Sequence, residues 1–317
     1  MIKSKIKTIS IITPCFNEAD NISKCAAHVK NMMENELSKY KYEHIFCDNS
    51  STDSTVAIIK TLAKKDKNIK LIVNSRNVGP FRNMWNGMKN ADGHAIIPLL
   101  PADLQDPPNV IPKFVKKWEE GNLVVYGERI NRKESLYMRK ARSFYYKTIK
   151  KFAFANIPLN SGEFMLVDRL VLDSILELDD QYPYIRGLVA QTGVSSSSVS
   201  YTWEKRISGK SKNSFIDLVD QAINGFVSTS RLPARIILLF GFAFSLIGLC
   251  LGAVTFIILL LNRSDVAIGI PTIIVGMFIF GGLQLLFLGV LGEYILSIHG
   301  QVRKSPPMFE IERMNFK

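Results

Sequence analysis

Apolar and polar residues follow two different spacings along the first 130 residues. Short apolar runs predict buried strands, and longer segments with apolar side chains at helical spacing predict amphipathic helices between them. This alternation is typical of an α/β fold with a largely parallel sheet covered on both faces. The expected strands are residues 9–13, 44–47, 71–73, 95–100 and 123–126, and the expected helices are residues 21–37, 54–65, 81–90 and 109–120. Two later strands are expected at residues 163–167 and 199–201.

Two long apolar runs lie in the last third of the chain. Residues 236–261 and residues 266–292 contain no charged side chain. Each run exceeds the roughly 20 residues that an α-helix needs to cross a bilayer core. We therefore expect two transmembrane helices, at about 235–261 and 267–292, within a membrane segment 233–295. The alternative interpretation is a pair of helices buried in a very large soluble core.

The basic residues predict how these helices are oriented. Lys and Arg residues flank the pair on both sides, whereas the turn between the runs holds only Arg263 and Asp265. The flanking residues are Arg231, Arg235, Arg303 and Lys304. By the positive-inside rule, both flanks lie in the cytoplasm. Because the first run begins after residue 230, it is not a signal peptide. We expect a multi-pass protein of the bacterial inner (plasma) membrane, with a domain at 1–212 and a tail at 296–317, both cytoplasmic.

Residues 213–232 form a separate amphipathic segment just before the first run. Phe215, Val219, Ala222 and Phe226 fall on one face of a helix, which predicts a helix in the lipid interface or packed against the α/β domain. The second apolar run contains four small residues that let helices approach closely, which favours a homo-oligomer. These are Gly276, Gly281, Gly282 and Gly289.

The net charge of +12 is concentrated before the apolar runs. Residues 129–151 hold nine basic residues and one acidic residue. A basic domain beside a membrane suits anionic lipid head groups and phosphorylated substrates, although general solubility also explains the average. We expect no nucleic-acid partner. The four cysteines show no CxxC spacing, so we expect free thiols and neither a disulfide framework nor a zinc site.

Polar loops follow the predicted strands at the edge where ligands of parallel sheets bind. Residues 13–18 follow the first strand, and residues 47–55 follow the second with Asp48 at its end. Ser51 or Asp53 is a candidate cap for the next helix. Residues 101–108 follow the fourth strand, and their carboxylate and amide oxygens are of the kind that bind Mg²⁺ or Mn²⁺. Asp106, which precedes two prolines, is also a candidate helix start.

Taken together, these segments resemble the family 2 glycosyltransferases. The resemblance is closest to the polyprenyl-phosphate branch, which includes dolichol-phosphate mannosyltransferase and the bactoprenol glucosyltransferases. It covers essentially the whole chain. The matching stretches are TPCFNEADNI (13–22), DNSSTDST (48–55), ADLQDPP (102–108), VVYGERINR (124–132), NSGEFMLVDR (160–169), YIRGLV (184–189), RISGKSKNSF (206–215) and GEYI (292–295).

The resemblance implies a GT-A (Rossmann-like) fold, a divalent cation (Mg²⁺ or Mn²⁺), a nucleotide-sugar donor and a polyprenyl phosphate acceptor. By position, the nucleotide-binding residues are Pro14, Asn17, Glu18, Asp48, Ser50 and Asp103. The metal ligands are Asp103 and Gln105. One departure is Pro101, which stands where the family usually has the first aspartate of an Asp-x-Asp motif.

The acceptor phosphate calls for positively charged groups, since arginine binds phosphate through two parallel hydrogen bonds. The phosphate is already ionised at pH 7, so a strong general base is not required. The candidates for acceptor binding are Arg129, Arg139, Ser161, Lys210 and Lys212, with Arg132 behind them. The candidates for catalysis are Asp103, Arg129, Glu163 and Arg206. Contact with lipid head groups alone is the alternative for some of these basic residues.

The activity that the resemblance implies is inverting transfer of a hexose, in the first place glucose, from a UDP-sugar to undecaprenyl phosphate. The same reaction with GDP-mannose or another UDP-sugar is the alternative. Pro101 keeps open a weakly active, nucleotide-binding membrane scaffold. A processive polysaccharide synthase usually has more spans and a Gln-x-x-Arg-Trp motif, and neither is present here. Without charges inside the apolar runs, anchoring is a more economical interpretation of them than transport.

Overall fold

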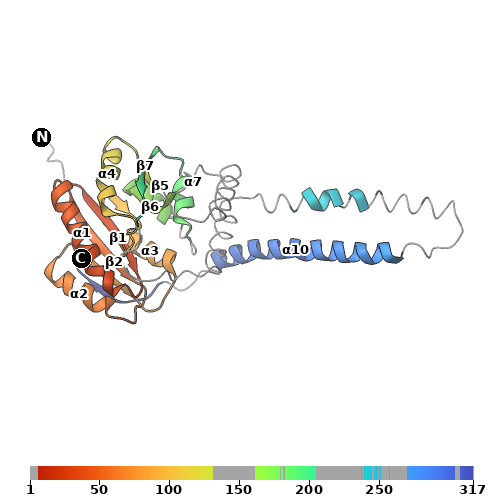
Figure 1. Ribbon diagram of the computed structural model, residues 1–317, viewed down its shortest axis with the longest axis horizontal. Helices are drawn as coiled ribbons and strands as arrows, with labels where there is room; N and C mark the ends of the chain where they lie inside the picture. Colours follow the sequence, from red (N-terminus) through yellow and green to blue (C-terminus); the bar gives the residue numbers. More distant parts are fainter. Residues whose placement is uncertain are drawn as a thin grey trace.

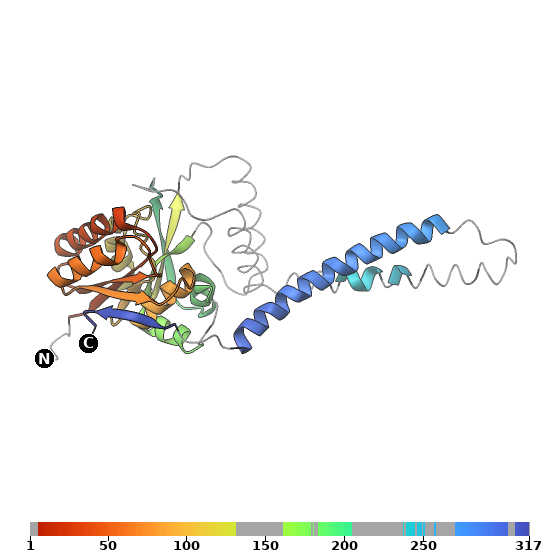
Figure 2. The ribbon, with the colours of Figure 1, turned by 90° about the horizontal axis from the view of Figure 1, so that it is seen from below.

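The computed structural model describes residues 6–130, 161–178, 180, 183–204, 270–303 and 308–316, together with residues 237, 239–244, 246–248, 250 and 257. An α/β domain forms one part of the molecule, and the long helix α10 (Ile270–Val302) projects away from it (Figures 1 and 2). Three segments that carry sequence predictions lie outside the described residues, namely 131–160, 205–236 and most of 237–269.

A single eight-stranded sheet organises the α/β domain. Its centre is parallel, because β1 pairs with β2 and β4, and β2 pairs with β3. The sheet is mixed toward its edges, where β6 is antiparallel to both β4 and β5, and β8 is antiparallel to β3. In sheet order the strands are β7 (Ser196–Thr202), β5 (Val124–Ile130), β6 (Ser161–Asp168), β4 (Ala95–Ile97), β1 (Thr8–Cys15), β2 (Lys41–Asp48), β3 (Ile69–Asn74) and β8 (Glu310–Met314).

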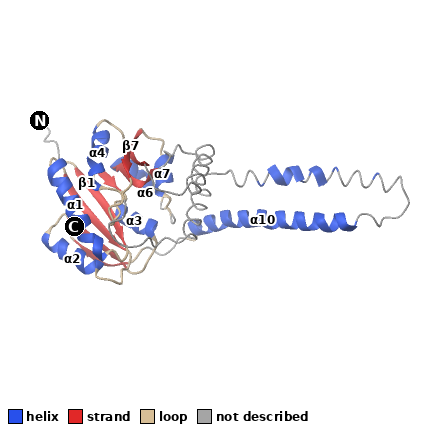
Figure 3. Cartoon of the chain, in the orientation of Figure 1, coloured by secondary structure: helices blue, strands red, loops and turns tan. Residues whose placement is uncertain are grey.

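Helices cover both faces of this sheet (Figure 3). Alternate side chains of β1 point to opposite faces: Ile9 and Ile11 pack with α1 and α4, whereas Ile12 packs with α3, α6 and α7. The helices are α1 (Ala19–Glu36), α2 (Thr55–Lys65), α3 (Pro80–Lys89), α4 (Ile111–Glu119), α6 (Arg169–Leu176) and α7 (Ile185–Gln191), with a short 3₁₀ helix, η1, at Pro108–Val110. The parallel strands are therefore buried from two sides, as the apolar runs predicted.

All the strands and helices expected in the first 130 residues are confirmed, with shifts at their ends. The strand expected at 95–100 is shorter, because β4 ends at Ile97. Pro98 follows and has no N–H to donate to a ladder. The strands expected at 163–167 and 199–201 are confirmed as β6 and β7. The sheet is less parallel than the alternation suggested, because β6 lies between β4 and β5.

Helix α10 contains a segment that is long and apolar enough to cross a membrane. Within the described residues, Ile279–Leu296 has a mean hydropathy of 1.8, and none of it is buried. The helix continues to Val302, beyond the end expected at about residue 292, and spans about 50 Å at 1.5 Å per residue. The other expected span, 235–261, lies mostly outside the described residues, as does the amphipathic segment 213–232. The two-helix hairpin therefore stays a prediction.

The tail after α10 returns to the α/β domain, which the sequence did not indicate. Strand β8 pairs with β3, placing Met314 opposite Leu71 and Glu310 opposite Asn74. Just beyond β8, the side chain of Asn315 donates to two backbone carbonyls, at 2.7 Å each. The sheet thus extends past the 1–212 range expected for the domain and includes residues from the other side of α10.

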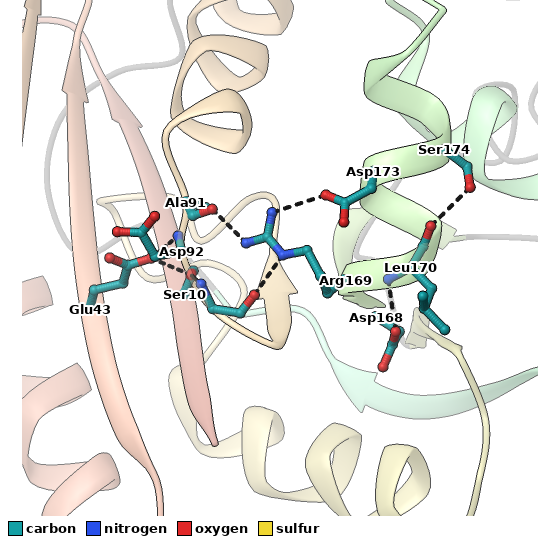
Figure 4. Close-up of polar contacts among 10 residues, drawn as sticks. Ser10, Glu43, Ala91, Asp92, Asp168, Arg169, Leu170, Asp173 and Ser174 are labelled. Carbon is teal, nitrogen blue, oxygen red and sulfur yellow. Dashed lines mark hydrogen bonds and ion pairs between the residues drawn. The ribbon is translucent and has the colours of Figure 1, made fainter. Parts of the chain in front are cut away.

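Charged residues also close the amino ends of the central strands. We call Ser10, Glu43, Lys70, Asp92 and Arg169 the amino-edge network. Glu43 accepts from the Ser10 hydroxyl at 2.5 Å and pairs with the Lys70 ammonium at 2.5 Å. The backbone N–H of Asp92 donates to Glu43 at 2.6 Å, and the Arg169 guanidinium donates to the carbonyls of residues 91 and 93 (Figure 4). These contacts join β1, β2 and β3 to residues 91–93 and to the start of α6.

Candidate active site

The loops that follow β1 and β2 lie together at the carboxyl edge of the sheet. The backbone N–H of Asn17 donates to the Ser51 hydroxyl at 2.8 Å, and the Asn17 side chain accepts from the N–H of Thr52 at 2.8 Å. The N–H of Glu18 donates to the Thr55 hydroxyl at 2.9 Å. The polar side chains of one loop therefore hold the backbone of the other.

Two residues in these loops adopt the left-handed backbone conformation, Asn17 with φ 54° and Ser50 with φ 64°. This conformation is uncommon outside glycine and concentrates at functional sites. The N-cap residue of α2 is Ser54 and not Asp53. The Asp53 carboxylate instead accepts hydrogen bonds from the backbone N–H groups of Thr55 and Ala19. Partial burial raises the pKa of Asp53, but the hydrogen bonds from Thr55 outweigh it and lower the pKa.

Asp48 is fully buried where β2 ends. Burial raises the pKa of its carboxyl group, against hydrogen bonds from Ser51 that lower it. One oxygen accepts from the Ser51 N–H at 2.9 Å. The next residue, Asn49, joins its side-chain amide to Asn77 at 2.8 Å and accepts from the N–H of Val78 at 2.9 Å. A third loop, after β3, is therefore attached beside Asp48, and the sequence had assigned this loop no role.

The loop after β4 contains the two candidate metal ligands. Asp103 is buried, and its carboxylate accepts from the backbone N–H of Gln105 at 3.1 Å. Between them, Leu104 has φ 57°, a conformation that costs a residue with a Cβ atom roughly 1–2 kcal/mol. The carbonyl of Pro101 accepts from the N–H of Leu104 at 3.1 Å. Pro101, which departs from the family pattern, therefore closes the turn at residues 101–104 through its backbone carbonyl.

Asp106 does not start a helix but belongs to a buried cluster with Arg129 and Tyr201, here called the Asp106 cluster. The Asp106 carboxylate accepts from Arg129 Nε at 2.9 Å, from Arg129 Nη2 at 2.6 Å and from the Tyr201 hydroxyl at 2.5 Å. Arg129 Nε also donates to the Tyr201 oxygen at 3.1 Å. Burial alone lowers the pKa of Arg129, but the Asp106 carboxylate outweighs it and raises that pKa.

The candidate acceptor residues Arg129 and Ser161 come from neighbouring strands. Ser161 pairs with residue 128 of β5, and a Cβ at Gly162 would lie 3.2 Å from Arg129 Nη2. The guanidinium therefore lies close over this backbone, and a side chain at position 162 would push it by a few tenths of an ångström. The carbonyl of Ser161 accepts from Arg186, which the sequence did not single out. Glu163 is half-buried on the same strand.

The structure brings together two groups of predicted residues. The first gathers the nucleotide candidates Pro14, Asn17, Glu18, Asp48 and Ser50 in the interlocked β1 and β2 loops. The second places Arg129 and Ser161 on adjoining strands. Arg139, Arg206, Lys210 and Lys212 lie outside the described residues, as does Arg132.

A family model described as "Glycosyl transferase family 2" matches residues 10–176, which hold the β1, β2 and β4 loops. The chain belongs to glycosyltransferase family 2. The GT-A sheet expected from the resemblance fits the observed fold. The protein is therefore a glycosyltransferase, and the loops at the carboxyl edge are its candidate active site.

Relatives of this glycosyltransferase match over nearly its whole length. It is 32% identical to the SfII prophage-derived bactoprenol glucosyl transferase of Shigella flexneri, over 94% of this chain and 96% of that protein. It is 31% identical to the uncharacterized glycosyltransferase YkcC of Bacillus subtilis, over 94% and 91%. Among solved structures it is similar to the mannosyltransferase PcManGT of Pyrobaculum calidifontis in complex with GDP-Man and Mn²⁺. That match has 16% identity and a TM-score of 0.43, over 77% of this chain and 81% of that one.

The donor set of the β4 loop fits a hard divalent cation. A buried carboxylate at Asp103 and a side-chain amide at Gln105 carry oxygen atoms of the kind that such a cation binds. Within the described residues, no group of three His, Cys, Asp or Glu side chains forms a fuller cage. Mg²⁺ usually keeps several waters and binds substrate phosphates, so this glycosyltransferase does not require such a cage. Cys15, Cys25, Cys47 and Cys250 are free thiols, as predicted.

Proposed function

We propose that this glycosyltransferase transfers a hexose, in the first place glucose, from a UDP-sugar to a polyprenyl phosphate such as undecaprenyl phosphate, with inversion at the anomeric carbon. The proposal rests on one observation: a family 2 catalytic sheet shares its chain with a helix whose 18-residue apolar segment has no buried residue. An acceptor that resides in the bilayer explains why such a helix accompanies the enzyme. The relatives named bactoprenol glucosyl transferase support the lipid acceptor and glucose.

We also propose that α10 is the second helix of a membrane hairpin, with spans at about 235–261 and 267–292. The catalytic domain and both termini then lie in the bacterial cytoplasm, and residues 213–232 lie in the lipid interface. A Cβ at Gly276, Gly281, Gly282 or Gly289 would meet nothing within 4 Å. This open surface supports assembly of copies through the membrane helices, because small residues allow close helix packing.

The donor nucleotide is proposed to bind along the β1 and β2 loops, against Pro14, Asn17, Glu18, Asp48 and Ser50. Asp103 and Gln105 would hold Mg²⁺ or Mn²⁺ beside the diphosphate. A cation bound there neutralises the charge that develops on the leaving diphosphate. The buried carboxylate of Asp103 supports this role, because a bound cation compensates its charge.

The acceptor phosphate is proposed to bind Arg129 and Ser161, together with Arg139, Lys210 and Lys212. Glu163 and Arg206 would complete the reaction site. A lipid phosphate is a ready nucleophile at pH 7, so the protein has to position it more than to deprotonate it. The support is that Arg129 and the Ser161–Gly162 backbone adjoin on two strands that reach the carboxyl edge.

The deciding experiment is a donor screen on the purified full-length protein. Labelled UDP-glucose, GDP-mannose and other UDP-sugars are each incubated with undecaprenyl phosphate and Mn²⁺ or Mg²⁺, and lipid products are extracted into organic solvent. We expect label in the organic phase with UDP-glucose, and NMR of the product to show an inverted anomeric configuration. Asp103→Ala is the matched negative control.

A second candidate function follows from Pro101, which contributes no side-chain ligand. A weakly active, nucleotide-binding membrane scaffold would bind a nucleotide but leave all label in the aqueous phase with every donor. Extraction of a labelled lipid with GDP-mannose instead of UDP-glucose would keep the reaction class and change the sugar.

A further inference from the structure

The strained loop between the two candidate metal ligands is held in place from outside. Leu104 adopts a left-handed conformation that its own side chain disfavours, with φ 57°. Such strain persists only where the surroundings over-determine the backbone. Leu104 itself is buried in the core cluster that also contains Phe114 and Phe164. Burial fixes the middle of the loop but does not fix the direction of the residues that follow.

Those following residues are attached to β5 and to the end of β7. The backbone carbonyl of Gln105 accepts from the N–H of Glu204 at 3.0 Å. Asp106 uses both carboxylate oxygens, with three hydrogen bonds of 2.5–2.9 Å from Arg129 and Tyr201. Arg129 and Tyr201 are register partners in the parallel β5–β7 pair, so the cluster is built on two regular strands.

We propose that the Asp106 cluster positions the metal-binding loop, with Asp106 and Tyr201 acting as positioning residues for Asp103 and Gln105. This inference rests on the proposed function, since it assigns a role toward the cation of that site. Asp106 is 1% exposed, so its charge has no solvent alternative to Arg129. The cluster therefore ties the chain three residues after Asp103 to β5 and β7.

The same cluster links the two substrates of the proposed reaction. Arg129 is a candidate ligand of the acceptor phosphate, and its Nε and Nη2 atoms already bind Asp106. The carboxylate thereby fixes the plane of the guanidinium that would meet the acceptor. The competing explanation is that the Asp106 cluster affects acceptor binding alone. Measurements of cation and nucleotide binding distinguish this explanation from the proposal, because neither ligand needs the acceptor to bind.

The test measures Mn²⁺ binding to the full-length protein by loss of the free-ion EPR signal, with UDP present and with GDP in a parallel titration. Tyr201→Phe keeps the ring and the ion pair but removes the hydroxyl, and Asp106→Asn keeps the shape but removes the charge. We expect Mn²⁺ affinity to fall about tenfold in Tyr201→Phe and further in Asp106→Asn. Nucleotide affinity without metal, measured by calorimetry, should change less than twofold. Tyr126→Phe is the matched control, because Tyr126 lies buried on β5 in the cluster on the opposite face.

Each outcome decides the proposal. Wild-type Mn²⁺ affinity in folded Tyr201→Phe and Asp106→Asn would overturn it, even if transfer is lost, and would assign the cluster to the acceptor. If Asp106→Asn does not fold, Tyr201→Phe alone decides. Failure of the wild-type protein to bind Mn²⁺ with either nucleotide would overturn both this inference and the proposed metal site. Normal wild-type binding with unaffected variants would overturn this inference alone.

Discussion

Charged side chains gather at both ends of the central strands, and the two ends use them differently. At the amino edge, Glu43 and Lys70 are 6% and 11% exposed and neutralise each other at 2.5 Å on regular strands. At the carboxyl edge, Asp48 ends strand β2, and Asp103 lies in the irregular loop after β4. Three of the four non-glycine residues with positive φ among the described ranges belong to the loops after β1, β2 and β4. The amino edge is built for stability, whereas the carboxyl edge places its acids beside loops with strained backbone, which is typical of a reaction site.

The largest effect should come from the carboxyl edge. Asp103→Ala removes the buried carboxylate proposed to bind the cation, and we expect transfer to fall at least about 1,000-fold, since such a cation supplies several kcal/mol. The temperature of thermal unfolding, measured for the variant and the wild type, shows whether the variant is folded. The measurement is lipid-linked product per minute at saturating donor. Near-normal turnover would refute the metal assignment.

The next largest effect should come from the amino edge, and it should lower stability without lowering turnover. Glu43→Gln leaves the Lys70 ammonium beside only the exposed Asp92, and loss of one partner of a buried ion pair costs about 3 kcal/mol of unfolding free energy. Turnover per folded molecule should not change. Chemical unfolding in detergent measures the loss, and Glu34→Gln, which breaks a surface pair with Lys30, is the control with little expected effect. A large loss of turnover in folded Glu43→Gln would contradict the assignment of the amino edge to stability alone.

The smallest effect concerns His44, which lies between the two edges. Burial lowers the pKa of His44 from 6.5 to about 3. Below pH 6.5 the unfolded chain takes up a proton that the folded protein does not, so stability falls as pH decreases toward 3, by about 1.4 kcal/mol per pH unit. His44→Gln, which can still bond to the Thr13 hydroxyl, should reduce this slope. Unfolding curves at pH 7.5, 6.5 and 5.5 measure it. The control is His28→Gln, on the exposed side of α1. An unchanged slope in His44→Gln would show that His44 does not control the acid sensitivity.

Much of the fold follows from local pattern. Short apolar runs located the parallel strands, and the polar residues after them located the loops that now adjoin. The Asp106 cluster could not be predicted in the same way. Asp106, Arg129 and Tyr201 are separated by 23 to 95 positions, and only the β5–β7 pairing and the path of the loop after β4 bring them together.

Strand β8 was missed for a related reason. Its five residues, Glu310–Met314, alternate in burial but follow a strongly apolar helix, so the local signal is short and its partner lies far away in the chain. Pro101 is the opposite case, a residue whose importance the sequence overstated. Its side chain gave the sequence reading its main difficulty, yet the structure uses its carbonyl, which every residue type possesses.

The position of β8 also imposes an order on biosynthesis. The outer edge of β3 emerges from the ribosome early, but the strand that covers it follows α10 and is made last. At about 5–20 residues per second, the ribosome needs on the order of tens of seconds to synthesise the chain between them. Throughout that time β3 presents unpaired backbone groups, which are a template for aggregation. A shortened enzyme that ends before the apolar helix would keep this edge open permanently, so removing α10 and the tail to gain solubility would expose the sheet instead.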